Sequence, residues 1–369
     1  MIINFSTLNQ KPLVDPELTP RDIGTPITLE DLKEAGAEFE KQVESLDDLK
    51  DLLESEDDSI YAEIVNDLMI ASSDKISVPA GKELHLKVDS KITCAKEGFV
   101  VEDRGKLVLT GSGTLETSNK STKGAIVTLE GPNAFVEIDG VTLDAVSIQG
   151  KENNFGYAIY IKNNASLDFK SGVIRTAYGS CISTNNTTGG TTVVNITGGE
   201  LYSDGSYAIY LPSQGTVNIT GGKVQGINAR MGIVNISGNA EIIPTTITQD
   251  TCDSIGRDFD TSGCVWLGDT VAVMAGTYTD DQGTNCEINV SGNAKITSNF
   301  RSAIGIYEVD TKAQQNVAVT VQNIANVTTT AEGFDSVQVF NHDYIAEQAQ
   351  VAGKTYNPTV QSNVVVTIN

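Results

Sequence analysis

A short phrase that recurs along the chain constrains the fold more than any other feature. The phrase is Val-Asn-Ile followed by Ser or Thr and then Gly, and it begins at Val194, Val217 and Val234. Two β-branched residues around one polar residue predict a strand with one buried face, and the following Ser/Thr-Gly pair predicts the turn that ends it. So short a unit cannot bury its apolar side alone and needs copies above and below it. The phrase therefore predicts a solenoid of strands.

Weaker copies of the phrase extend this pattern over most of the chain. Most of their spacings suit one coil of three strands with loops of different length, which predicts a parallel β-helix. The longest gap, between Ile236 and Val290, predicts one extra coil plus an insertion. We expect the second apolar residue of each copy to stack inside the solenoid, at Leu109, Ile138, Phe169, Ile196, Ile219, Ile236, Val290 and Val321.

A second column consists of a small residue followed by a β-branched one. Cys181 and Cys264 stand in it where other coils have alanine, so we expect both to be buried as small apolar side chains. The five cysteines show no CxxC pair and no metal-ligand spacing. The members of the column are Ala125-Ile126, Ala158-Ile159, Cys181-Ile182, Ala208-Ile209, Cys264-Val265 and Ala303-Ile304.

The residue after each of these pairs is expected to face outward, by the alternation of a strand. Three of these positions are aromatic, and stacked aromatic rings can bind sugar rings. Tyr160, Tyr210 and Trp266 are therefore the candidate ligand-binding residues, although tyrosine is also simply a good strand residue. The full set is Val127, Tyr160, Ser183, Tyr210, Trp266 and Gly305.

A third column consists of the asparagines inside the recurring phrase. Asn195, Asn218 and Asn235 are expected to face outward and to hydrogen-bond to one another along the stack.

The N-terminal region has a different character. Four prolines in the first 26 residues predict an extended arm over residues 1–27, and a helix is predicted from Leu29 to about Val43. We therefore divide the chain into an attachment segment, 1–43, and a β-helix, 44–369, with an irregular insertion at about 244–287. The apolar residues of the arm have no helical period, so we expect them to bind another chain; they are Ile2, Ile3, Phe5, Leu8, Leu13, Val14 and Ile23.

Residues 45–92 carry a resemblance to a known class. A short amphipathic helix (SLDDLKDLLES) is followed by IYAEIVNDLMI and ISVPAGKELHLKVDSKI. This order resembles the opening of right-handed β-helix proteins of the pectate-lyase-like class. The resemblance implies an all-β, right-handed, single-stranded parallel β-helix whose helix covers the N-terminal end of the core. It implies no particular activity, because this scaffold hosts lyases, hydrolases, adhesins and virus fibres.

Charge and composition exclude several classes of function. The chain has 48 acidic and 25 basic residues and a formal net charge of −23, so it lacks the clustered Lys and Arg that nucleic acid requires. No apolar run approaches about 20 residues, which argues against membrane insertion. The first residues show neither a basic n-region nor an apolar h-region, so no secretory signal is expected.

The insertion at about 244–287 is rich in aspartate, a residue type that both catalysis and metal binding use. Paired carboxylates can hydrolyse glycosidic bonds, and oxygen-rich loops can hold Ca²⁺. However, acidic residues are common in any loop of an acidic protein, and no acid/base set recurs on neighbouring coils. His85 and His342 are the two histidines and lie near the two ends of the solenoid. We therefore assign no catalytic or metal-binding residue and expect no cofactor.

The layout of an arm, a capping helix and a long β-helix resembles that of bacteriophage fibre, tailspike and decoration proteins. It implies a structural virion protein, made in the host cytoplasm and attached to a phage capsid or tail protein through the arm. Its β-helical shaft would form a homo-oligomer, with a trimer favoured, and would bind host-surface polysaccharide. The alternatives are a tailspike-like polysaccharide depolymerase and a bacterial surface adhesin.

Overall fold

The structure is a computed structural model in which the region from Lys41 to Asn369 forms one unit. It describes residues 41–118, 124–146, 157–177, 179–184, 192–246, 268–273, 285–308, 316–341, 343–344, 347, 350 and 363–369. The arm residues proposed to bind a partner lie outside the described residues, as do Trp266, Cys264 and His342.

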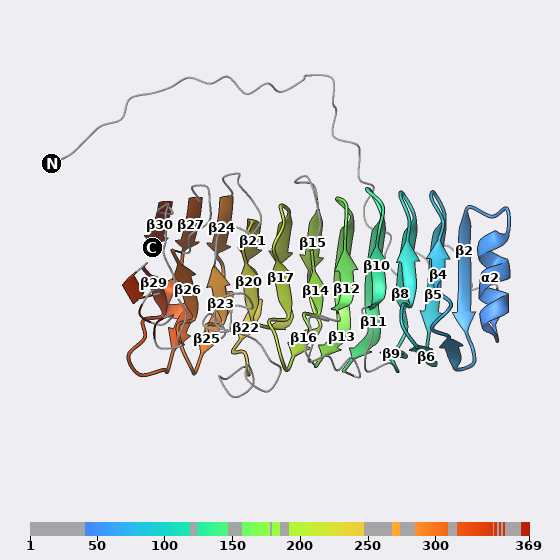
Figure 1. Cartoon of the computed structure of the whole chain (residues 1–369), viewed down its shortest axis with the longest axis horizontal. Helices are drawn as coiled ribbons and strands as arrows, with labels where there is room; N and C mark the ends of the chain where they lie inside the picture. The colour runs from blue at the N-terminus through green and yellow to red at the C-terminus, as the bar shows by residue number, and fades with distance from the viewer. Residues whose placement is uncertain are drawn as a thin grey trace, which may run out of the picture. The chain divides into compact units, whose positions relative to one another are not determined.

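Strands in the described region fall into three stacks, and every pairing recorded between them is parallel (Figure 1). The first stack contains β1 (Lys41–Val43), β2 (Ser59–Ile64), β5 (Glu83–Val88), β8 (Lys106–Thr110), β11 (Phe135–Ala145), β13 (Ser166–Thr176), β15 (Val193–Ile196), β18 (Thr216–Ile219), β21 (Gly232–Ile236), β24 (Asn285–Val290), β27 (Asn316–Val321) and β30 (Asn363–Ile368).

The second stack contains β3 (Leu68–Ile70), β6 (Lys91–Cys94), β9 (Thr114–Thr117), the far halves of β11 and β13, β16 (Glu200–Ser203), β19 (Lys223–Gln225), β22 (Glu241–Ile243), β25 (Lys295–Ser298) and β28 (Val327–Thr329). A short 3₁₀ helix, η2 (Ile324–Asn326), precedes β28. The third stack contains β4 (Ile76–Val78), β7 (Phe99–Val101), β10 (Ala125–Leu129), β12 (Tyr157–Ile161), β14 (Ile182–Ser183), β17 (Ile209–Leu211), β20 (Ile227–Ala229), β23 (Val271–Val273), β26 (Ile304–Tyr307) and β29 (Val337–Phe340).

Strands β11 and β13 pass through both the first and the second stack, which joins these stacks into one 20-stranded sheet; the third stack is a separate 10-stranded sheet. From β2 to β29, each coil contributes to all three stacks, with β11 and β13 each serving the first two. This arrangement confirms the predicted all-β parallel β-helix.

The core follows the predicted register of the recurring phrase. Ile138 lies against Leu109 and Phe169, and Ile219 lies between Ile196 and Ile236. All of these side chains are fully buried, because the strands alternate between inward and outward positions. The apolar column predicted inside the first stack is therefore confirmed.

The N-terminal end of the core is covered by helix α2 (Leu46–Glu54), as the resemblance to β-helix proteins implied. Ser45 caps it: the Ser45 hydroxyl accepts from the Asp48 N–H, and the Asp48 carboxylate accepts from the Ser45 N–H. Leu49 and Leu53 are buried against the first coil. The helix thus ends the apolar column at this side.

The predicted helix from Leu29 to Val43 is wrong in its last three residues. Lys41–Val43 form strand β1, which pairs in parallel with β2. Val43 is fully buried in the core, so pairing with the next coil and burial of this side chain outweigh local helix preference. Residues 29–40 lie outside the described residues.

Two details of the predicted coil alignment are also wrong. The extra coil between Ile236 and Val290 does not exist, since β21 pairs directly with β24 and the additional residues are accommodated within one coil. In the third stack Val127, rather than Ile126, aligns with Ile159. The later inward positions are Ile227 and Val271, in place of the predicted Val265. Val127 therefore faces inward and is fully buried, contrary to prediction.

Glycines occupy the corner where β11 and β13 bend from the first stack to the second. Gly140 and Gly172 have φ of 99° and 106°, in the region that favours glycine. A Cβ on Gly140 would lie within 3.0 Å of the carbonyl oxygen of Gly111, on the coil below. The coils approach so closely here that only a residue without a side chain fits.

Candidate functional site

The two described members of the predicted aromatic column, Tyr160 and Tyr210, lie on the outer face of the third stack. Tyr160 and Tyr210 both face outward and are half-buried, as predicted. Ser183, which is fully buried, separates them in the stack, so the two rings are not on adjacent coils. Asn228 and Ala272 follow Tyr210 on the next two coils. The structure does not bring Tyr160 and Tyr210 together, and their role in ligand binding stays a prediction.

Each tyrosine instead has local partners. The Tyr160 ring lies 5.3 Å from the Tyr157 ring, and the Lys162 ammonium is 5.1 Å from its centre. The Tyr210 ring lies 5.8 Å from the guanidinium carbon of Arg230. These contacts are compatible with an ordinary structural role for both rings.

An amide ladder runs along the outer face of the first stack. Asn218 Nδ2 donates to Asn195 Oδ1 at 2.9 Å, and Asn235 Nδ2 donates to Asn218 Oδ1 at 2.9 Å. The predicted hydrogen bonding along the asparagine column is therefore confirmed. The ladder extends further than predicted: Asn289 donates to Asn235 at 3.0 Å, and Asn195 donates to the Asp168 carboxylate at 2.8 Å.

The bonds of this ladder all have the same direction. Each Nδ2 donates toward the preceding coil, and Asp168, whose ionised carboxylate can only accept, is the acceptor at the end of the chain of bonds. A second, shorter ladder has the same direction: Asn316 donates to Asn285 at 3.0 Å and Asn363 to Asn316 at 3.4 Å. Asn289 and Asp168 lie within weaker copies of the recurring phrase, so the sequence contained the signal for them.

Ion pairs replace amides on the coils nearest α2. Lys87 Nζ lies 2.8 Å from a carboxylate oxygen of Glu63, and Lys170 Nζ lies 2.7 Å from one of Glu137. Both pairs join adjacent coils, and their side chains are between 18% and 36% exposed. Each exposed pair contributes on the order of 0–1 kcal/mol. His85 stacks on Tyr61 at 4.4 Å between ring centres, and burial lowers the pKa of His85.

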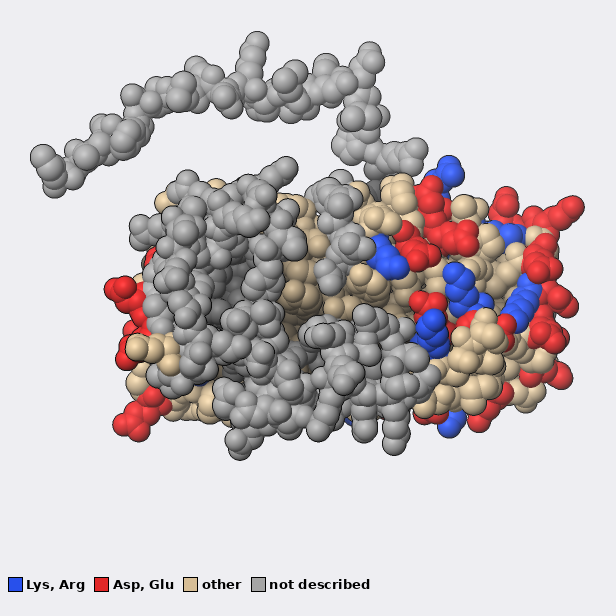
Figure 2. All heavy atoms as spheres, in the orientation of Figure 1, with Lys and Arg blue, Asp and Glu red and all other residues tan. Residues whose placement is uncertain are grey.

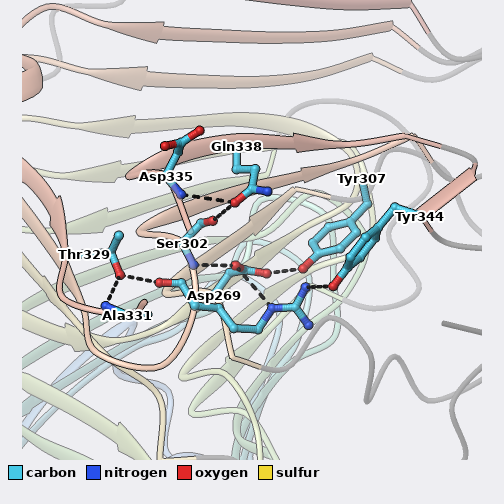
Figure 3. Close-up of polar contacts among 9 residues, drawn as sticks. Asp269, Ser302, Tyr307, Thr329, Ala331, Asp335, Gln338 and Tyr344 are labelled. Atoms are coloured by element: carbon cyan, nitrogen blue, oxygen red, sulfur yellow. Dashed lines mark hydrogen bonds and ion pairs between the residues drawn. The ribbon is translucent and has the colours of Figure 1, made fainter. Parts of the chain in front are cut away.

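A buried cluster of polar groups lies on the outer face of the last coils (Figure 3). The Asp269 carboxylate is fully buried and accepts hydrogen bonds from the Ser302 N–H, at 2.9 Å, and from the Tyr307 hydroxyl. Its side chain occupies the space above Gly305, where a Cβ would meet the carboxylate. Arg301 Nε lies 3.8 Å from Asp269 Oδ1.

Aromatic rings enclose the guanidinium of Arg301. Its central carbon lies 5.0–6.0 Å from the ring centres of Tyr307, Phe334, Phe340 and Tyr344, and Arg301 Nη2 donates to the Tyr344 hydroxyl at 3.0 Å. The Tyr307 and Phe340 rings are stacked at 4.7 Å. The cluster thus connects β26 and β29 to the residues that precede β23 and follow β29. It is a structural clasp that the sequence analysis missed, because its members are distant in sequence and follow no repeat.

The clasp makes a testable prediction for pH dependence. Burial raises the pKa of Asp269 to about 6 from 3.8, although Arg301 acts in the opposite direction. Because the folded protein binds this proton more tightly than the unfolded chain, the contribution of Asp269 to stability is complete below about pH 4 and is lost as the pH rises through 6. We expect the free energy of unfolding to fall by up to about 3 kcal/mol over this range from this group alone.

Urea unfolding at pH 4, 5, 6 and 7 measures this effect. Asp269→Asn removes the titrating group, so the pH profile of the variant should be flatter or should rise with pH, because other carboxylates such as Asp89 have lowered pKa values. Glu241→Gln, at an exposed position on β22, is the control and should keep the wild-type profile. Parallel profiles for the wild type and Asp269→Asn would contradict this assignment.

The described cysteines are buried thiols. Cys94, Cys181 and Cys286 are free, and burial raises the pKa of each to about 12. The predicted burial of Cys181 is confirmed, and its thiol donates to the Tyr202 carbonyl at 3.0 Å. Thiols in this state are poor nucleophiles and poor metal ligands.

The described residues contain no group of three or more His, Cys, Asp or Glu side chains arranged to hold a metal ion. Most aspartates of the insertion lie outside these residues; Asp269 is the one described, and it belongs to the clasp. Among all the residues that the structure describes, no helix has the length and apolar character needed to cross a membrane.

Compared with known proteins, the chain matches no family model, no curated protein and no solved structure. Its assignment as a parallel β-helix therefore rests on its own strand register.

Proposed function

We propose that the protein is a structural component of a bacteriophage particle, a head or tail fibre or a decoration protein. Its β-helix is the shaft, and its N-terminal segment is the attachment device that binds a capsid or tail protein. The observation that carries this proposal is that polar side chains on the outer face of the first stack bond from one coil to the next. These amide hydrogen bonds and ion pairs suit a stiff structural element.

The described carboxylates also support a structural role rather than catalysis. General acid catalysis requires a raised pKa on a group that can reach the substrate. Asp269 has the raised pKa, but it is fully buried beneath Tyr307. Outward carboxylates such as Glu63 and Glu137 are paired with lysines of the neighbouring coil. The depolymerase alternative therefore has no support from the described residues.

The capping helix supports the assignment of attachment to the arm. Because α2 already covers the first coil, the β-helix does not need residues 1–27 to close its core. The apolar residues of the arm then serve contacts with another chain. A shaft of this kind would act as a homo-oligomer, with a trimer favoured, and host-surface polysaccharide would be its ligand in the virion.

Deletion of residues 1–27 tests the proposal. We expect the truncated protein to keep the thermal unfolding midpoint of the full chain, to within about 2 °C for a change below 1 kcal/mol. We also expect it to be absent from purified particles when it replaces the full chain during infection. Mass spectrometry of the particles measures incorporation.

Two further variants test whether attachment depends on the apolar side chains of the arm or only on the length of the arm. Replacement of Ile2, Ile3 and Phe5 by serine should abolish incorporation, whereas replacement of Asn9 and Gln10 by serine should not. Normal incorporation of the truncated protein, or unfolding of the β-helix on truncation, would refute the role of the arm.

A further inference from the structure

Charge is distributed unevenly along the outer face of the first stack. The outward side chains of β2, β5, β8, β11 and β13 include Glu63, Glu83, Lys87, Lys106, Glu137 and Lys170. On the face that Figure 2 shows, acidic and basic side chains gather over the coils nearest α2. From β15 to β30 the outward side chains are almost all uncharged, and Glu287 is the exception among them.

We call this second part the neutral face: the outward side chains of β15, β18, β21, β24, β27 and β30. It is accessible, since none of its side chains is in the buried class. The two amide ladders run along it. Apart from Glu287, the remaining positions carry Thr or small and branched apolar residues such as Thr216, Ile233 and Thr320. In a chain with a net charge of −23, so large an uncharged surface is not explained by the demands of solubility.

The ladders leave hydrogen-bonding capacity on this surface. An asparagine amide has two N–H donors and two acceptor lone pairs. Asn218 uses one N–H toward Asn195 and one lone pair toward Asn235. At least one donor and one acceptor per amide therefore remain, and they recur about every 4.8 Å along the stack.

A ligand that fits this surface must be uncharged and must supply groups that both donate and accept. Hydroxyl groups do so, because they rotate to suit the partner. A protein surface with fixed donors and acceptors would leave part of the amide array unpaired, which costs about 1–3 kcal/mol per buried group. An anionic polymer would be repelled by the net charge of the chain. Ile233 and Val193 add small apolar patches beside the amides, which suit the C–H faces of sugar rings.

We propose that the neutral face binds an uncharged polysaccharide, so that the ligand surface lies on β15–β30 of the first stack rather than at Tyr160 and Tyr210. This inference deepens the proposed function by naming the class of ligand and its place. Binding is a property of the purified protein, so it can be tested independently of incorporation into a particle.

Native-gel affinity electrophoresis of the full chain tests the proposal. The gels contain dextran, mannan or a β-1,3-glucan as uncharged probes and polygalacturonate as the anionic comparison. We expect at least one uncharged probe to retard the wild type, while polygalacturonate does not. The double variant Thr216→Glu/Thr320→Glu should raise the dissociation constant at least about tenfold.

The control variant adds the same charge to the other half of the stack. Ser59→Glu/Thr110→Glu should bind as the wild type does, and far-UV circular dichroism should show that both variants are folded. The proposal is overturned if no uncharged probe retards the wild type, or if the control loses affinity equally. Sedimentation tests whether a second copy of the chain, rather than a polysaccharide, occupies the neutral face. If the wild type is an oligomer and Thr216→Glu/Thr320→Glu dissociates it, the proposal is also overturned.

Discussion

Ile219→Asp is expected to abolish cooperative folding of the central coils. Ile219 is fully buried between Ile196 and Ile236, and the stack on either side is continuous. Loss of the apolar side chain costs roughly 1.5–3 kcal/mol, and an unpaired carboxylate in this position adds several kcal/mol more. The total is a large part of the ~5–15 kcal/mol that stabilises a typical folded domain.

Far-UV circular dichroism and urea unfolding measure this loss. Thr220→Asp, at the next residue, is the matched control, because Thr220 is exposed and faces the turn. The control should unfold within about 0.5 kcal/mol of the wild type. A cooperative unfolding transition of Ile219→Asp close to that of the wild type would show that the position is not in the core.

Gly140→Ala should lower the free energy of unfolding more than the same substitution at Gly81. The positive φ of Gly140 costs an L-residue about 1–2 kcal/mol, and the added Cβ would overlap the carbonyl oxygen of Gly111. Since that oxygen belongs to the backbone of the neighbouring coil, it can move only if the stacking distance changes. We expect a loss of more than about 3 kcal/mol, measured by urea unfolding.

Gly81→Ala separates the two causes. Gly81 also has positive φ, 79°, but a Cβ there would have nothing within 4 Å. Its substitution should therefore cost only the conformational share, about 1–2 kcal/mol. Equal losses for the two variants would mean that contact between coils at the corner is not what requires glycine.

The sequence predicted those parts of the fold that repeat. The positions from Leu109 to Val321 could be aligned because each coil of the first stack presents the same alternation to its neighbours. The asparagine ladder followed from the same alignment. The short helix that becomes α2 was predicted from its own residues, because the cap at Ser45 and the apolar face of the helix both depend on residues close in sequence.

The parts that failed depend on contacts between distant segments. The start of the β-helix at Lys41 depends on pairing with β2, which no local pattern reveals. In the third stack the strands are as short as Ile182–Ser183, so the alternation covers too few residues to fix a register. The clasp of Asp269 and Arg301 follows no repeat and joins residues tens of positions apart.

Because all bonds of the amide ladder have the same direction, coils could be gained or lost during evolution. Every coil from Asn195 to Asn235 presents an acceptor to the coil that follows and a donor to the coil that precedes. A duplicated coil inserted between them would meet the same chemical groups that its neighbours meet now. Gene duplication or loss of one coil could thus lengthen or shorten the molecule by a fixed step of about 4.8 Å without redesign of either end. The ladder therefore allows the length of this β-helix to evolve by whole coils.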